Sequence, residues 1–177
     1  MKAGWRAWLL VAAVLGGCAT RPADLPAGDA LSGRMTVRVD ATEAAQARNL
    51  SAAFELHGDA LQGRLDLSTP LGTTLAQAQW MPGRVALVTS QGETRFANLD
   101  DLTREVMGES VPVAALFDWL RGRPWPGAAS VAAPPPDEPG FVQLGWVVSL
   151  ARFDKGWIAA RRERLPAVTV RAKLDRP

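Results

Sequence analysis

The sequence has one cysteine, one histidine and no tyrosine among its 177 residues. Cys18 has no partner for a disulfide within the chain, and one cysteine with one histidine, His57, cannot form a typical zinc site. His57 lies on the polar side of a predicted strand, where we expect a surface residue, and no nucleophile-elbow motif accompanies it. The glycines have neither a phosphate-loop nor a dinucleotide-binding spacing. We therefore predict no catalytic residue, no metal site and no cofactor, and a protein that is not an enzyme.

The sequence also lacks an excess of charge of one sign. It contains 20 Lys+Arg and 18 Asp+Glu. Without Lys2 and Arg6, which belong to the signal peptide predicted below, the two counts are equal at 18. A nucleic-acid-binding surface would require a basic stripe. The one basic cluster, residues 161–164, is interpreted as a solvated loop, and the acidic pairs at 100–101 and 137–138 as helix-terminal and loop charges. We predict no nucleic-acid partner.

Long hydrophobic runs are absent as well. The apolar segment 8–15 follows Lys2 and Arg6, and as a helix it would be about 12 Å long, too short for a bilayer core of about 30 Å. Small residues then precede Cys18, as at the cleavage site of a secretory signal. We predict that residues 1–17 are a signal peptide and that residues 18–30, rich in Pro, Ala and Gly, form a tether.

From Leu31 onward, apolar and polar residues alternate with the period of a β-strand. Short turns between such segments predict an antiparallel meander with one apolar face, in a domain over residues 31–177. The proline-rich segment 124–140 is predicted to be a surface loop. The predicted strands cover residues 31–40, 51–57, 61–68, 73–80, 85–89, 93–97, 142–153, a short segment near 157, and 167–174.

Two amphipathic segments, 99–107 and 113–121, predict helices that cover the apolar face. The fold class is therefore mainly β (α+β). The helices and the sheet could enclose an apolar pocket or pack shut, and the periodicity does not separate these two arrangements.

The turn at residues 68–73 is unusual because its tip is apolar. Pro70 and Leu71 are predicted at the central positions of a type I turn, and Gly72 at the fourth. Leu71 could fold back onto neighbouring side chains, or it could project into solvent as an apolar finger.

Several motifs follow one another along the chain: a lipobox at 15–18 and the segments 31–34, 67–72, 111–113, 119–124 and 170–175. In this order they resemble the LolB family of outer-membrane lipoprotein receptors in Gram-negative bacteria. The resemblance implies an incomplete antiparallel β-barrel with a helical lid over a cavity for acyl chains. The family usually has a lid helix before the first strand, for which Pro22, Pro26 and Gly28 leave little room.

The resemblance also implies specific roles. Cys18 would carry the acyl anchor in the outer membrane, and Ala19 would not retain the protein at the inner membrane. Pro70, Leu71 and Gly72 would form the loop that delivers lipoproteins into the membrane. The implied partners are the periplasmic carrier LolA, acylated lipoprotein cargo and outer-membrane lipid, with the protein acting as a monomer without enzymatic activity.

Two other functions remain open from the residues alone: an anchored binder of lipids or other hydrophobic ligands, and a structural envelope lipoprotein. Apolar faces supply candidates for the lining of an acyl cavity, each of which could equally belong to an ordinary core. These candidates are Phe54, Leu65, Leu67, Trp80, Phe96, Leu116 and Trp119.

Overall fold

The computed structural model describes residues 30–175. The predicted signal peptide, Cys18 and residues 19–29 of the predicted tether lie outside the described residues. The expectation about an N-terminal lid helix concerns the same residues. One 11-stranded sheet dominates the described part, in the order β6-β5-β4-β3-β2-β1-β11-β10-β9-β8-β7. The strands are β1 (Leu31–Val39), β2 (Arg48–Gly58), β3 (Gly63–Ser68), β4 (Thr74–Met81), β5 (Arg84–Thr89), β6 (Gly92–Phe96), β7 (Ser130–Ala132), β8 (Gly140–Gln143), β9 (Trp146–Ser149), β10 (Trp157–Arg162) and β11 (Val168–Leu174).

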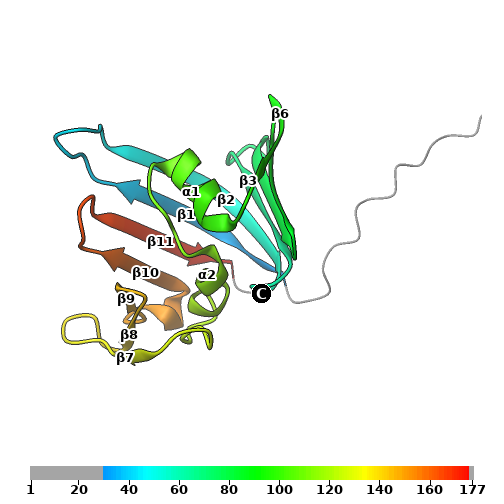
Figure 1. Cartoon of the computed structure of the whole chain (residues 1–177). Coiled ribbons are helices and arrows are strands. Elements are labelled where there is room, and N and C mark those ends of the chain that lie inside the picture. Colours follow the sequence, from blue (N-terminus) through cyan, green and yellow to red (C-terminus); the bar gives the residue numbers. More distant parts are fainter. Residues whose placement is uncertain (1–29, 176–177) are drawn as a thin grey trace, which may run out of the picture.

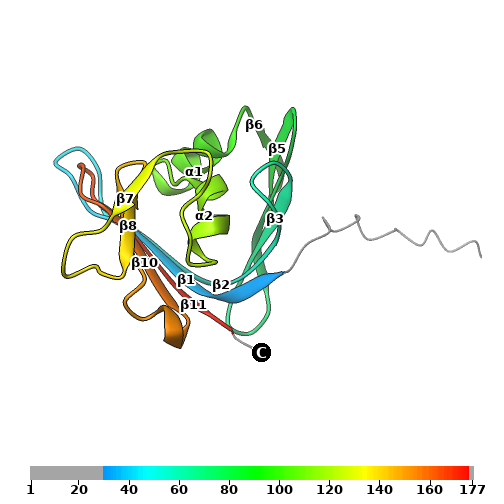
Figure 2. The same cartoon turned by 90° about the horizontal axis from the view of Figure 1, so that it is seen from below.

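All neighbouring strands pair antiparallel, and the edge strands β6 and β7 do not pair with each other. The sheet is therefore curved but not closed, which confirms the predicted mainly β fold of an incomplete barrel. Figures 1 and 2 show a trough with helices α1 (Leu99–Met107) and α2 (Val113–Trp119) on its concave side. No helix among residues 30–175 is long and apolar enough to cross a membrane.

Local sequence sets the ends of α1. The Asn98 side chain accepts a hydrogen bond of 2.8 Å from the backbone N–H of Asp101 and caps the first turn. Gly108 ends the helix with a φ of 78°, a conformation that favours glycine. The acidic residues at 100–101 therefore lie in the first turn, where the helix dipole favours negative charge.

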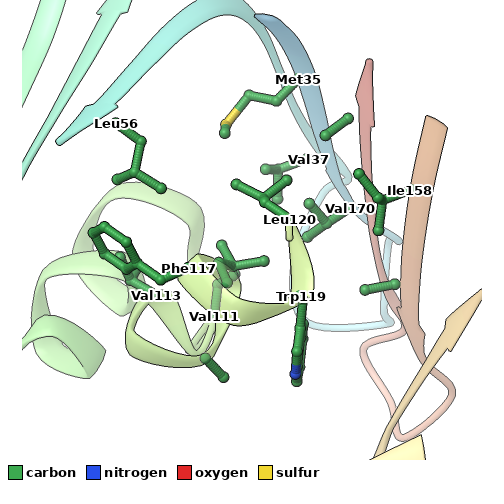
Figure 3. Close-up of a cluster of buried hydrophobic side chains, with 14 of the residues drawn as sticks. Met35, Val37, Leu56, Val111, Val113, Phe117, Trp119, Leu120, Ile158 and Val170 are labelled. Atoms are coloured by element: carbon green, nitrogen blue, oxygen red, sulfur yellow. The ribbon is translucent and has the colours of Figure 1, made fainter. Parts of the chain in front are cut away.

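The core lies between the concave face of the sheet and α2. Met35 and Val37 of β1 and Leu56 of β2 point from the sheet toward α2 and Leu120, with Leu56 on the side of Phe117 and Val37 beside Leu120, as Figure 3 shows. Trp80 of β4 meets Phe117 edge to face, with ring centroids 5.5 Å apart. The inward residues of the strands have the period of two that the sequence predicts, which explains why one face of the sheet is apolar.

The prediction that Leu61 belongs to a strand is wrong. Leu61 is 74% exposed in the turn before β3. Asp59 Oδ1 accepts hydrogen bonds from the N–H groups of Leu61 and Gln62, at 2.7 and 2.9 Å, and this Asx turn delays the strand until Gly63.

The prediction of one long strand over 142–153 is also wrong. Residues 140–149 form the hairpin of β8 and β9, joined at Leu144 and Gly145. Both residues have positive φ, 54° and 76°, as a type I′ hairpin turn requires. The predicted loop at 124–140 contains the short edge strand β7, and a 3-10 helix, η1 (Phe153–Lys155), precedes β10.

Two predicted surface groups are in fact buried. The ring of His57 lies along β2 with a nitrogen 2.9 Å from Glu55 Oε1, instead of extending into solvent. Arg162 points inward from β10, since it alternates with the outward Arg161, and its Nη2 donates to Glu109 Oε2 at 2.7 Å. The basic cluster is thus not a solvated loop, because Arg162 connects the sheet to the segment between α1 and α2.

We expect Glu109→Ala to lower the free energy of unfolding by about 1.5–3 kcal/mol, the value of a hydrogen bond to a charged group. The Arg162 side chain is only 9% exposed and would lose its carboxylate partner. The measurement is urea unfolding. Glu163→Ala, which removes the exposed partner of Arg161, is the control and should change stability by less than about 1 kcal/mol. Equal effects of the two substitutions would contradict the structural role of Arg162.

Candidate apolar binding site

A cavity of about 250 Å³ lies between the concave face of the sheet and the two helices. Its walls come from the inward residues of β1 to β5, from α1 and from the beginning of α2. Among the described residues that line it, none carries a charge, and only Thr89 and Thr103 are polar. The lining residues are Met35, Val37, Leu50, Leu65, Leu67, Ala76, Ala78, Leu87, Thr89, Leu99, Leu102, Thr103, Val106, Met107, Val111, Val113 and Leu116.

The predicted candidates divide by residue type. Leu65, Leu67 and Leu116 lie in the cavity wall, whereas the four aromatic candidates are not among the residues that line it. Phe54, Trp80 and Trp119 are buried in the filled core, and Phe96 is partly buried at its edge.

The aromatic candidates have packing partners of their own. Trp80 contacts Phe117, and its Nε1–H donates to the backbone oxygen of Asp59 at 3.1 Å. Trp119 is fully buried on the other side of the trough, with Phe141 and Trp146 at centroid distances of 6.3 and 6.0 Å. Large rings thus fill the trough near β8 and β9 and, through Trp80 and Phe117, beside the last residues of β4. The space remains among the aliphatic residues of β1 to β5.

Sequence reasoning did not select the contribution of α1 to this cavity. Leu99, Leu102, Val106 and Met107 all line it. The signal was present, because these residues share one face of the predicted helix 99–107. The pattern indicates that this face packs on the sheet, and it does not distinguish a filled contact from a cavity wall.

Few polar contacts hold α1 over the cavity. Arg48 of β2 donates to the carbonyl oxygen of Val106 at 3.2 Å, near the end of the helix. Thr103 Oγ1 accepts a hydrogen bond of 3.0 Å from the N–H of Val111, in the segment that leads to α2. The cavity is smaller than the roughly 300–1,000 Å³ typical of small-molecule sites, so a larger apolar ligand requires its walls to separate.

The turn between β3 and β4 projects an apolar side chain into solvent. The N–H of Gly72 donates to the oxygen of Thr69 at 2.9 Å, with Pro70 and Leu71 at the central positions. Thr69 Oγ1 accepts a further bond of 3.2 Å from the N–H of Thr73. Leu71 is 95% exposed and therefore does not fold back onto its neighbours. Of the two conformations considered for Leu71, the structure has the projecting one.

The fold and the site define a protein with an open, curved antiparallel sheet and a helical cover that enclose an apolar cavity. Residues 30–175 contain no group of three or more His, Cys, Asp or Glu side chains that could hold a metal ion. The comparisons with known proteins then give the particular family. The family model described as outer membrane lipoprotein LolB matches residues 30–173.

Curated relatives agree with this match. The chain is 34% identical to the outer-membrane lipoprotein LolB of Bordetella petrii over 160 residues, covering 84% of this chain and 79% of that protein. It is 37% identical to the protein of the same name from Ralstonia nicotianae over 179 residues, covering 93% and 83%. The chain belongs to the LolB family and is an outer-membrane lipoprotein of a Gram-negative bacterium.

Proposed function

We propose that this protein accepts acylated lipoproteins from the periplasmic carrier LolA into its apolar cavity and inserts them into the inner leaflet of the outer membrane. The observation that carries the proposal is the uncharged cavity wall between α1 and β1 to β5. The exposed Leu71 and membership of the LolB family support it. Catalysis has no part in this function.

The physical requirement of such transfer is that acyl chains never become fully exposed to water. Each methylene contributes about 0.8 kcal/mol, so a lipid-modified protein with dozens of methylenes has a very costly aqueous state. An apolar cavity lowers this cost during passage from the carrier to the membrane. If the receptor binds more tightly than the carrier and the bilayer more tightly still, transfer needs no nucleotide.

Acylation of Cys18 would hold the protein at the membrane. One acyl chain gives marginal membrane binding, and more than one acyl chain gives stable anchoring. The loop of Pro70, Leu71 and Gly72 would then make the contact with the bilayer at which cargo is released. Burial of a single leucine contributes roughly 1.5–3 kcal/mol, which is too little to anchor the protein but enough to favour release at the membrane.

The direct test uses a soluble Cys18→Ala protein without residues 1–17, mixed with carrier loaded with a triacylated lipoprotein. Cargo should appear on the soluble protein, as measured by co-purification. Failure of transfer to a correctly folded protein would contradict the receptor function and would favour binding of another apolar ligand. The cavity itself argues against a purely structural role, because a sheet and helices that serve only to pack have no reason to leave about 250 Å³ between them.

Filling the cavity should block acceptance. We expect Ala76→Phe, which adds a ring to the cavity wall, to reduce capture of a fluorescent fatty acid at least about tenfold. The free energy of unfolding should fall by no more than about 3 kcal/mol. Because no described charged residue lines the cavity, capture should change little with salt.

Ala53→Phe is the matched control, because Ala53 lies on the opposite face of the sheet, next to Ser68 of β3 in the register. It introduces the same ring without entering the cavity. Undiminished capture by Ala76→Phe, or equal loss in both variants, would place the acyl chains elsewhere.

A further inference from the structure

The outer, convex face of the sheet has an exposed tryptophan among cations. Trp157, at the start of β10, is 38% exposed. Arg152 Cζ lies 5.5 Å and Lys173 Nζ 5.9 Å from the centroid of the ring. Both distances are within the range of cation–π attraction, so the ring and the two charges form one local unit.

A recess of about 400 Å³ adjoins this tryptophan. Arg152 and Arg171 both line it, together with Trp157, Ala159 and Ser149. Two guanidinium groups at one recess supply several N–H donors in the planar arrangement that suits phosphate oxygens. The recess lies on the opposite side of the sheet from the acyl cavity, so the two sites do not share residues.

Two further cations extend the basic surface. Arg34 of β1 lies opposite Lys173 in the register with β11, and Lys155 accepts at its carbonyl oxygen a hydrogen bond from the Lys173 ammonium group. We call the set Arg34, Arg152, Lys155, Trp157, Arg171 and Lys173 the Trp157 patch.

The charge of the Trp157 patch is not neutralised by ion pairs. None of its five cations takes part in a salt bridge among residues 30–175. The nearby carboxylates of Asp154 and Asp175, and that of Glu55 opposite Ser32 in the register with β1, leave an excess of positive charge. Other arginines of the outer face are paired with acidic partners, namely Arg38 with Asp40, Arg64 with Asp66 and Arg161 with Asp137. The surplus is therefore local, in a protein whose charges otherwise nearly balance.

The position of the patch relates it to the membrane anchor. Arg34 is three residues after Leu31, where the chain from the predicted tether enters the sheet. The N–H of Asp175, at the end of β11, donates to the oxygen of Ser32 at 2.9 Å, so both chain ends of the sheet meet here. Figure 2 shows that this outer face of β1, β10 and β11 is turned away from the helices.

We propose that the Trp157 patch binds the anionic phospholipid headgroups of the membrane in which the protein is anchored. Tryptophan favours the interface between headgroups and acyl chains, and each basic residue near an anionic surface adds attraction of electrostatic origin. An acyl chain combined with a basic patch is a physically sufficient pair of anchoring signals. Docking by the outer face leaves the concave side, with α1 and the cavity, turned toward the periplasm, where a soluble carrier can reach it. This consequence for cargo acceptance depends on the proposed function, whereas the headgroup binding does not.

The test uses the soluble Cys18→Ala protein without residues 1–17 and without cargo or carrier. It is sedimented with vesicles of phosphatidylcholine alone or of phosphatidylcholine mixed with phosphatidylglycerol. Binding is expected only to the anionic vesicles and should weaken as salt rises. Arg152→Glu/Arg171→Glu should reduce this binding by about tenfold or more. Arg152→Gln/Arg171→Gln, which adds no negative charge to the sheet, provides a second variant and should reduce it by a smaller factor.

Arg84→Glu/Arg95→Glu is the matched control, because it changes the net charge equally on β5 and β6. It should retain most of the binding. Equal loss in both double-Glu variants would show a net-charge effect and overturn the proposal. Absence of vesicle binding by the parent protein would also overturn it. The same vesicles carry no lipoprotein, so failure here is distinct from failure of cargo transfer, which the loaded-carrier assay measures separately.

Discussion

Leu71→Glu is expected to abolish delivery of lipoproteins to the membrane while acceptance from the carrier continues. Leu71 is 95% exposed, so its replacement removes almost no core contact and the fold should keep its stability. Transfer of a leucine into the bilayer is favourable by roughly 1.5–3 kcal/mol, whereas an ionised carboxylate resists leaving water. We expect the rate of delivery to liposomes to fall at least about tenfold, measured as cargo that floats with the lipid.

Leu61→Glu is the control for this experiment. Leu61 is also a highly exposed leucine in a hairpin turn, but it precedes β3, whereas Leu71 follows that strand. The two side chains therefore project from opposite ends of the sheet. Delivery by Leu61→Glu should be unchanged. Equal defects in both variants would mean that any exposed carboxylate interferes, and the specific role of Leu71 would be lost.

Leu71 and the Trp157 patch suggest two separate contacts with the membrane. The patch lies on the outer face at β1, β11 and β10, while Leu71 lies in the turn after β3, two strands away from β1 in the order of the sheet. Salt screens the attraction between the Trp157 patch and anionic headgroups, but it does not screen the burial of the Leu71 side chain. High salt should therefore weaken docking of the empty protein more than it slows insertion of cargo that is already bound.

Local patterns were sufficient to predict most elements of the fold. The alternation in β1 and β11, the turn chemistry at Pro70 and Gly72, and the amphipathic face of α1 each operate within a few residues. They give the antiparallel sheet, its helical cover and the position of Leu71. The exposure of Leu71 required the structure, because a turn leucine can also contact its own hairpin.

Features that depend on distant residues could not be predicted in this way. Burial of Arg162 depends on Glu109, 53 residues earlier in the chain. The β8–β9 hairpin requires a leucine, Leu144, at positive φ, which sequence patterns disfavour. The cavity depends on where aromatic and aliphatic side chains lie in the trough. Alternation along a strand predicts which face of the sheet is apolar, but it does not predict whether side chains fill the space above that face.

We expect the loss of Trp119 to destabilise the fold most, because its buried ring fills the trough near β8 and β9. Its indole Nε1–H donates to Gln143 Oε1 at 2.8 Å, and the same oxygen accepts from the N–H of Trp125 at 2.9 Å. The amide group of Gln143 in turn donates to the oxygens of Trp125 and Ala128, each at 2.7 Å. One buried amide thus connects α2, β8 and the segment after α2, and Trp119 packs over it.

Trp119→Ala is expected to lower the free energy of unfolding by about 3–5 kcal/mol, because it leaves a large void beside Phe141 and Trp146. Trp119→Phe retains much of the packing, and Gln143 Oε1 keeps its bond from Trp125, so a loss of about 1–3 kcal/mol is expected. Urea unfolding followed by circular dichroism measures both. In Trp119→Phe, fatty-acid capture by the folded protein should remain, because Trp119 does not line the cavity. A Trp119→Phe protein that is as stable as its parent but no longer captures fatty acid would instead place this tryptophan in the binding site.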